Sequence, residues 1–124
     1  MTPGKAVCIV DDDESVRDSL QFLLTCNGLL AHSFSTPSDL MGRMPGDIGC
    51  LILDLHMPDM NGLELMTVLR GAGISAPIII ISGRRDAAAD AALRGAGAMA
   101  ILSKPFDDRD LLLLLKQAME PSAG

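Results

Sequence analysis

One strand that ends in an acid limits what this chain can fold into more than any other feature. Residues 50–53 are all apolar, and the residue that follows them is Asp54. An unbroken apolar run is typical of a strand covered on both faces, in the middle of a parallel sheet. Residues 57–62, MPDMNG, cannot extend the strand, because proline lacks an amide donor and Asn-Gly favours a tight turn. Asp54 therefore lies at the carboxyl end of a buried strand, where open α/β sheets bind ligands.

The composition fits a single globular domain. The chain has 124 residues, of which 48% are hydrophobic, enough for one core and too few for two domains. Acidic residues number 16 against 10 Lys and Arg, so the formal net charge is −6 at pH 7. Because no basic stripe is available to neutralise a phosphate backbone, we expect no direct nucleic-acid binding by this segment. No apolar stretch reaches bilayer length and no signal peptide is evident, so we expect a cytoplasmic location without membrane contact.

The cysteines predict free thiols rather than a redox or metal site. Cys8, Cys26 and Cys50 are odd in number, lack metal-ligand spacing and lie in apolar segments. Buried free thiols are the expected outcome, and redox sensing is the less common alternative.

Apolar runs alternate with amphipathic stretches along the chain. The expected strands are 6–10, 29–34, the run that ends at Asp54, 78–81 and 98–102. The expected helices are 15–26, 35–44, 61–70, 85–94 and 107–119. Because parallel neighbours need right-handed crossovers, this (βα)5 order predicts a doubly wound α/β fold around a five-stranded parallel sheet. We expect the domain to span residues 1–120, with 121–124 as a disordered tail or the start of a linker.

Helical spacing also predicts which side chains turn inward. The expected inward residues are Val16, Leu20, Leu23 and Leu24 in the first helix, Leu65, Val68 and Leu69 in the third, and Leu111, Leu112, Leu115 and Met119 in the last. Leu113 or Leu114 is then left pointing outward. The fourth helix is rich in alanine and removes little apolar area from water, so we expect it to be the most weakly held.

Polar side chains follow four of the expected strands. These residues are Asp11 and Asp12 after the first strand, Asp54 after the third, Ser82 after the fourth, and Ser103 and Lys104 after the fifth. Converging carboxylates repel one another unless a cation joins them, and oxygen ligands are those that Mg²⁺ prefers. A hydroxyl and a lysine beside the acids suit a phosphoryl group. Each residue alone has an ordinary role as a cap, a turn residue or an ion-pair partner, so the prediction depends on their joint placement.

At this point the chain resembles the receiver domains of two-component response regulators, over nearly all of its length. The resemblance is carried by residues 10–14 (VDDDE), 53–62 (LDLHMPDMNG), 81–83 (ISG) and 103–106 (SKPF). Residues 14–20 (ESVRDSL) are most similar to receivers of the FixJ/NarL type. The resemblance implies a CheY-like, flavodoxin-like fold with strand order 2-1-3-4-5.

The resemblance also implies a role for each strand-end residue. Asp54 would accept a phosphoryl group from the phosphohistidine of a sensor histidine kinase or a phosphotransfer protein. Mg²⁺ would be held by Asp12, by Asp54, by Asp11 through water and by the backbone carbonyl of His56. Lys104 and Ser82 would bind phosphoryl oxygens, and Pro105 would follow a cis Lys–Pro bond.

The expected output is a signalling switch rather than an enzyme. Because the weakly held fourth helix begins just after Ser82, we expect phosphorylation to reshape a surface made by the fourth helix, the fifth strand and the last helix. This surface would grip a partner or output domain, or form a homodimer. The family often has Tyr or Phe where this chain has Ile101. Two alternatives remain. A phosphatase-like hydrolase would want a carboxylate where His56 stands, and a pseudo-receiver that only binds partners would not need the intact set of acids, hydroxyl and lysine.

Overall fold

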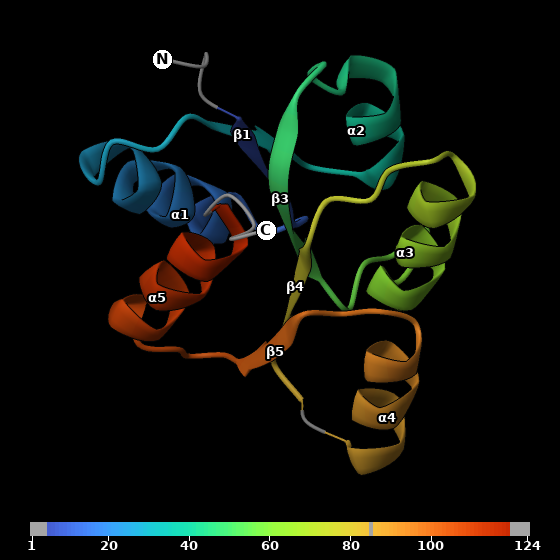
Figure 1. The fold of residues 1–124 in the computed structure, drawn as a ribbon. Helices are drawn as coiled ribbons and strands as arrows, with labels where there is room; N and C mark the ends of the chain where they lie inside the picture. Colours follow the sequence, from blue (N-terminus) through green and yellow to red (C-terminus); the bar gives the residue numbers. More distant parts are fainter. Residues whose placement is uncertain (1–4, 85, 120–124) are drawn as a thin grey trace.

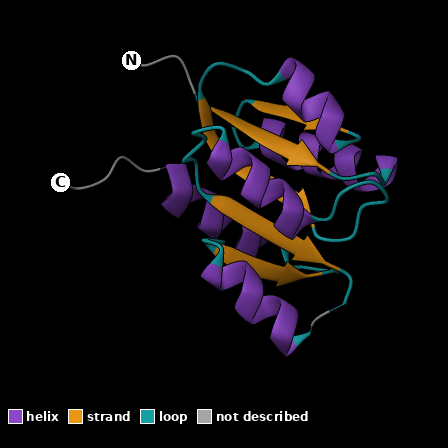
Figure 2. Ribbon diagram, turned by 90° about the vertical axis from the view of Figure 1, so that its right-hand side faces the viewer, coloured by secondary structure: helices purple, strands orange, loops and turns teal. Residues whose placement is uncertain are grey.

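A parallel five-stranded sheet runs through the centre of the computed structural model, which describes residues 5–84 and 86–119 (Figure 1). The strands are β1 (Ala6–Val10), β2 (Ala31–Phe34), β3 (Ile48–Asp54), β4 (Ile78–Ser82) and β5 (Ala100–Ser103). The helices are α1 (Glu14–Cys26), α2 (Pro37–Arg43), α3 (Gly62–Gly71), α4 (Ala87–Gly95) and α5 (Asp108–Met119). The strands pair in the order β2-β1-β3-β4-β5, as predicted, and their arrows run in the same direction (Figure 2).

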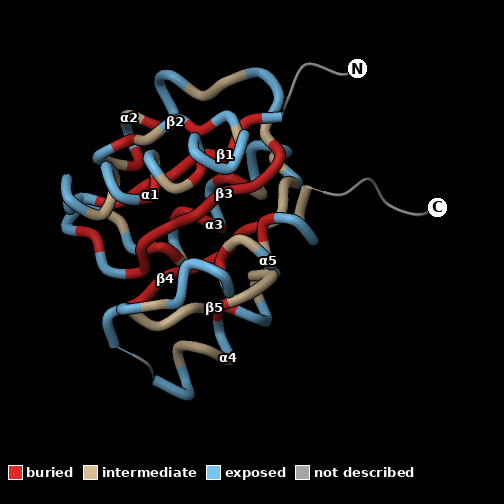
Figure 3. The backbone as a smooth tube through the Cα atoms, turned by 90° about the vertical axis from the view of Figure 1, so that its left-hand side faces the viewer, coloured by how far each residue is buried: buried red, intermediate tan, exposed pale blue. Residues whose placement is uncertain are grey.

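Helices cover both faces of the sheet and create two cores. In Figure 1, α1 and α5 lie on one side of the strands, and α2, α3 and α4 lie on the other. Alternate residues of β3 serve the two cores: Cys50 and Ile52 pack with side chains of α1 and α5, whereas Leu51 and Leu53 pack with side chains of α2, α3 and α4. β1 and β4 are buried along their whole length (Figure 3). The central strands are therefore covered on both faces, as their unbroken apolar runs predict.

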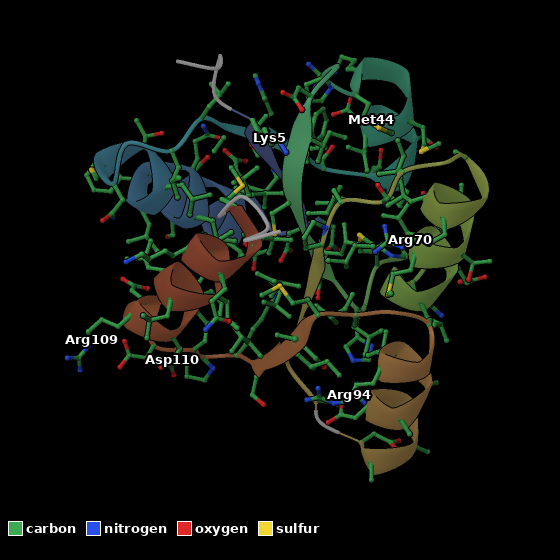
Figure 4. The ribbon with its side chains drawn as sticks, viewed as in Figure 1. Lys5, Met44, Arg70, Arg94, Arg109 and Asp110 are labelled. Carbon is green, nitrogen blue, oxygen red and sulfur yellow. The ribbon has the colours of Figure 1, made fainter. Side chains whose placement is uncertain are left out.

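Local residue choices explain where the helices begin and end. The Asp13 side chain caps α1 by accepting from the backbone N–H groups of Ser15 and Val16. Asn61 and Glu64 form a reciprocal capping box at the start of α3. Gly73 adopts a left-handed φ of 86° after α3, a conformation that glycine accepts readily and that ends the helix. From the last turn of α3, Arg70 reaches the chain that enters β4 and donates to the carbonyl oxygens of Ile74 and Ala76 at 2.7 and 3.0 Å (Figure 4).

Two strands begin later than predicted, because the residues predicted to begin them complete the ends of the preceding helices instead. β2 starts at Ala31 rather than residue 29, since the Leu29 N–H donates to the Leu24 carbonyl in the turn that ends α1. β5 starts at Ala100 rather than residue 98, since the Ala98 N–H donates to the Leu93 carbonyl at the end of α4. The fourth helix begins at Ala87 with Asp86 as its cap. The expected start of that helix at residue 85 and the expected tail at residues 121–124 lie outside the described residues.

The helix faces match the predictions with one clear error. α3 buries Leu65, Met66 and Leu69, whereas Val68, which we expected to turn inward, is 40% exposed. With Gly62, these residues form a buried stripe with a spacing of three, one and three residues, which sets Val68 on its flank. In α5, Leu111 and Leu115 are buried and Leu113 is 60% exposed, as predicted, while Leu112 is only partly buried.

The cysteines are free, but they are not all buried. Cys8 and Cys50 lie in the core, where burial raises the pKa of the Cys8 thiol to about 11 and that of the Cys50 thiol to about 12. Cys26 is exposed, contrary to the prediction, because it ends α1 two residues beyond the buried Leu24 and faces away from the sheet. Within residues 5–84 and 86–119, no helix is long and apolar enough to cross a bilayer.

Candidate functional site

Three carboxylates meet at the carboxyl ends of two neighbouring strands. β1 pairs with β3 in a register that sets Val10 beside Leu53, so the residues after each strand emerge side by side. One carboxylate oxygen from each of Asp11, Asp12 and Asp54 lies within 4.8 Å of the others. Asp11 is fully buried, Asp54 is 4% exposed and Asp12 faces solvent. The structure thus brings together the acids that the strand pattern predicts.

Lys104 joins this group from the end of β5, the edge strand two strands away from β3. Its Nζ lies 3.1 Å from Oδ2 of Asp11 and 3.5 Å from Oδ1 of Asp54. Its backbone N–H donates to the Ser82 carbonyl at 2.8 Å, and the Lys104–Pro105 peptide is cis, as the family resemblance implies. Lys104 therefore lies between the two buried acids and offsets part of their repulsion.

The buried charges shift the pKa values of the groups that carry them. Burial, and then the nearby Asp11 charge, raises the pKa of Asp54 above its ordinary value. Partial burial opposes the charged form of Lys104, but the hydrogen bond and charge of Asp11, together with the charge of Asp54, raise the pKa of that ammonium. The lysine consequently stays protonated while it faces the acids.

Ser82 ends β4 beside the acids and engages its own loop. Its hydroxyl donates to the carbonyl of Arg84, accepts from the Arg84 N–H at 3.1 Å and lies 3.4 Å from Nε2 of His56. His56 belongs to the same edge of the sheet, since its backbone N–H donates to Oδ1 of Asp54 at 3.3 Å. The His56 side chain is exposed, whereas Ser82 is buried.

Two residues that contact this site were not predicted from the sequence. Gly62 donates its N–H to the Leu55 carbonyl at 2.9 Å, and a Cβ there would lie 3.1 Å from the Asp54 carbonyl oxygen. Arg17 donates from Nη1 to the Asp11 carbonyl oxygen at 2.8 Å. Asn-Gly at 61–62 indicated only a turn, and the sole signal for Arg17 was an arginine one turn after the helix cap.

The donor set fits a divalent cation such as Mg²⁺. All of the converging atoms are carboxylate oxygens, which are hard ligands, and no thiol lies among them. Two of the acids are buried and the third opens to solvent, an arrangement that suits a cation retaining some of its water.

Two open cavities border residues next to the acids, one at Lys104 and the other at Leu55 and His56. The larger one, of about 500 Å³, lies between α1 and the β5–α5 loop. Lys104 and Phe106 form part of its wall, together with Leu20 and Leu23 of α1. The smaller one, of about 210 Å³, lies between α4 and the loop after β3.

Comparisons with known proteins agree on one family. The response regulator receiver domain family matches residues 7–116. The C4-dicarboxylate transport transcriptional regulatory protein DctR of Rhodobacter capsulatus is 36% identical over 121 residues, which is 95% of this chain and 61% of that protein. The transcriptional regulatory protein FixJ of Rhizobium meliloti is 38% identical over 116 residues, 92% of this chain and 56% of that protein. The chain thus spans about three fifths of the length of these curated relatives.

Solved structures share the fold over almost the whole chain. The crystal structure of FixJ-N superimposes with a TM-score of 0.86 at 34% identity, covering 99% of both chains. A response regulator receiver protein from Pseudomonas putida superimposes with a TM-score of 0.87 at 28% identity, covering 94% of this chain and 99% of that one.

Proposed function

The chain belongs to the response regulator receiver domain family of two-component systems, and we propose that it is a phosphorylation-controlled switch with Asp54 as its phosphoacceptor. One observation carries this proposal. Asp54 is a buried carboxylate at the end of a central strand, close to two further acids and in contact with a lysine. The donor would be the phosphohistidine of a sensor histidine kinase or a phosphotransfer protein.

Asp54 would act as a nucleophile toward phosphorus. One of its oxygens attacks in line, and the new P–O bond forms as the P–N bond to the donor histidine breaks. The electron pair of that bond leaves with the imidazole. Because a carboxylate is a weak nucleophile, the step depends on positioning and on neutralising the transferred oxygens. Lys104, whose Nζ contacts both Asp11 and Asp54, would bind one of those oxygens.

Asp12, Asp54 and the His56 backbone carbonyl would hold Mg²⁺ directly, and Asp11 would hold it through water. When bound, the ion would neutralise the acids and the phosphoryl oxygens. The protein residues supply the frame: Lys104 and the Asp13 N–H each occupy one oxygen of Asp11 and fix its carboxylate. The His56 N–H donates to Oδ1 of Asp54 at 3.3 Å, and Lys104 lies 3.5 Å from the same oxygen.

Ser82 would convert the new phosphoryl group into a change of shape. Its hydroxyl, now engaged with the Arg84 backbone, would turn to a phosphoryl oxygen and draw the β4–α4 loop inward. Only Leu93 of α4 is buried, and the cavity of about 210 Å³ beside α4 leaves room for the helix to move. Ile101 of β5 belongs to the same core as Leu93, so movement of α4 would reach β5 without an aromatic switch residue.

The reshaped surface would comprise α4, β5 and α5, including the exposed Leu113. We propose that it binds a partner or output domain, or forms a homodimer. The cavity of about 500 Å³ beside Lys104 could seat apolar side chains of the phosphodonor protein. The acidic balance of the chain favours protein partners over direct nucleic-acid contact, and we infer a cytoplasmic site of action.

A small phosphodonor such as acetyl phosphate tests this function against its alternatives. The expected result is at most one phosphoryl group bound per chain, Mg²⁺-dependent and lost in Asp54→Asn. Asp59→Asn is the matched control, because Asp59 is an exposed acid of the following loop. Many turnovers of released phosphate would instead identify a hydrolase, and absence of label with Mg²⁺ present would identify a pseudo-receiver.

A further inference from the structure

An arginine of α1 folds back onto the backbone of the acidic site. Arg17 is the fourth residue of the helix, and its Nη1 donates to the Asp11 carbonyl oxygen at 2.8 Å. Asp11 lies one residue beyond β1, where only its N–H, and not its carbonyl, still bonds to the neighbouring strand. Its carbonyl therefore depends on a partner from outside the sheet, and Arg17 supplies that partner.

The contact fixes the peptide that joins two of the three acids. The remaining polar atoms of Asp11 are also engaged: its N–H donates to the Phe34 carbonyl at 3.2 Å, Oδ1 accepts from the Asp13 N–H at 2.9 Å, and Oδ2 accepts from Lys104. Because a peptide unit is planar, holding the Asp11 carbonyl also sets the direction in which Asp12 leaves the strand. Across the described ranges 5–84 and 86–119, the Asp12 carboxylate itself receives no hydrogen bond or ion pair. Its position thus depends on its backbone.

We propose that Arg17 is a positioning residue for the divalent cation: by holding the Asp11–Asp12 peptide, it presents the Asp12 carboxylate toward Asp54 and sets the affinity for Mg²⁺. This inference rests on the proposed function of the acidic site. Arg17 does not contact the reacting atoms, and it acts only through the backbone of the two acids.

Charge and geometry predict opposite effects when Arg17 is removed. Arg17 is a cation near an acidic site, so losing its charge alone would strengthen the attraction of Mg²⁺. Losing the hold on the peptide would weaken binding. The sign of the change in affinity therefore distinguishes positioning from simple electrostatics.

Arg43 of α2 provides a matched control for the lost charge. It pairs with Asp39 at 2.7 Å and lies over the Phe34 ring, 5.3 Å from the ring centroid. Both arginines act on Asp39. The hydrogen bond from Arg43 is the main cause that lowers the pKa of Asp39, and the charge of Arg17 lowers it to a smaller extent. Arg43 differs in that its hydrogen bonds go to Asp39 and not to the Asp11–Asp12 peptide.

Isothermal titration of Mg²⁺ at fixed ionic strength tests the proposal without any phosphodonor. Arg17→Met should raise the Kd for Mg²⁺ about tenfold, as loss of a group that orients metal ligands does. Arg43→Met should change it by less than about twofold, because an exposed charge is screened. Arg17→Lys should fall between, since lysine keeps the charge but loses the planar fork. At saturating Mg²⁺, the rate of phosphorylation of Arg17→Met by acetyl phosphate should return close to the wild-type rate, which a general structural defect would not allow.

Affinity of Arg17→Met equal to or tighter than wild type would overturn the proposal. If thermal unfolding shows that Arg17→Met is not folded, Arg17→Lys decides, and wild-type affinity of that variant would overturn it. Failure of the wild-type chain to bind Mg²⁺ would instead refute the proposed function and this inference together.

Discussion

As the proposed phosphoacceptor, Asp54 would face two opposing demands. Burial raises the pKa of its carboxyl, yet a phosphoacceptor must be ionised to attack phosphorus. The ammonium of Lys104, 3.5 Å away, favours the ionised form of Asp54, and a cation bound by the neighbouring acids would favour it further. The metal-free domain should therefore carry unrelieved electrostatic strain at this one residue.

Replacing that carboxylate should stabilise the metal-free domain, and more so at neutral pH than in acid. The pKa of Asp54 is raised in the folded state, by burial first and then by Asp11, so in the window above its ordinary value of 3.8 the folded state binds more protons than the unfolded one. Stability from this group is consequently lost as the pH rises through that window, and Asp54→Asn removes the loss. We expect a gain of about 1 kcal/mol near neutral pH and a much smaller one near pH 4, measured by thermal unfolding in EDTA.

The exposed acid of the same cluster provides the comparison. Asp12→Asn should raise the melting temperature less than Asp54→Asn does, because Asp12 faces solvent and its charge is screened. A melting temperature of Asp54→Asn at or below that of wild type near neutral pH would show that the acids are not in electrostatic conflict.

The residues of the candidate site were predictable to the extent that strand ends determine them. Asp11, Asp54 and Ser82 each end a strand or directly follow one, and the ends of parallel strands meet at one edge whatever the details of packing. Arg17 and Gly62 escaped notice because their contacts are with backbone atoms of neighbouring loops. Such contacts depend on the path of the loop, which residue spacing does not encode.

At the scale of elements, α3 approaches the Asp54 backbone closely because its first residue, Gly62, has no side chain. A Cβ at Gly62 would lie 3.1 Å from both the Asp54 carbonyl oxygen and the Leu55 Cα. Gly62→Ala should therefore destabilise the domain by about 1 kcal/mol through overpacking, despite the higher helix propensity of alanine. Urea unfolding measures the difference.

The matched control is a glycine in open space. A Cβ at Gly42 of α2 meets no atom within 4 Å, so Gly42→Ala should raise stability by about 0.5 kcal/mol through helix propensity alone. If both variants are equally stable, the close approach of α3 to the Asp54 backbone does not constrain the domain.

Element existence was easier to predict than element faces and ends. The unbroken apolar runs of β1, β3 and β4 determine strands that must be covered on both sides. Val68 was placed wrongly because a short apolar helix admits more than one inward stripe, and packing against the sheet selected Met66 instead. The starts of β2 and β5 were placed early because apolar residues also complete helix caps.

At the scale of the whole molecule, α4 is the helix with the fewest buried residues. It buries only Leu93, whereas α3 buries four residues, and the cavity of about 210 Å³ lies beside it. Amides of α4 should exchange hydrogen fastest among the helices in the metal-free domain, because few buried contacts oppose its opening. Beryllofluoride, a mimic of phospho-Asp54, should change that protection, and sedimentation in the same buffer should reveal any dimer.

Helix α1, on the opposite face of the sheet, serves as the internal reference for this experiment. It is anchored by the buried Leu20 and Leu24 and should keep its protection when beryllofluoride is added. Equal protection of α4 with and without the mimic, and no dimer or bound partner, would locate the output surface elsewhere.

Phosphopeptide mapping of the wild-type chain tests the assignment of Asp54 most directly. After incubation with acetyl phosphate and Mg²⁺, digestion and mass spectrometry should find the mass of one phosphoryl group on the peptide that contains Asp54. The modification should disappear when EDTA is present. Without a cation, Lys104 alone neutralises only part of the negative charge of the acids and of the transferred phosphoryl group. A phosphoryl group on any other peptide, or undiminished labelling in EDTA, would contradict a Mg²⁺-dependent switch centred on Asp54.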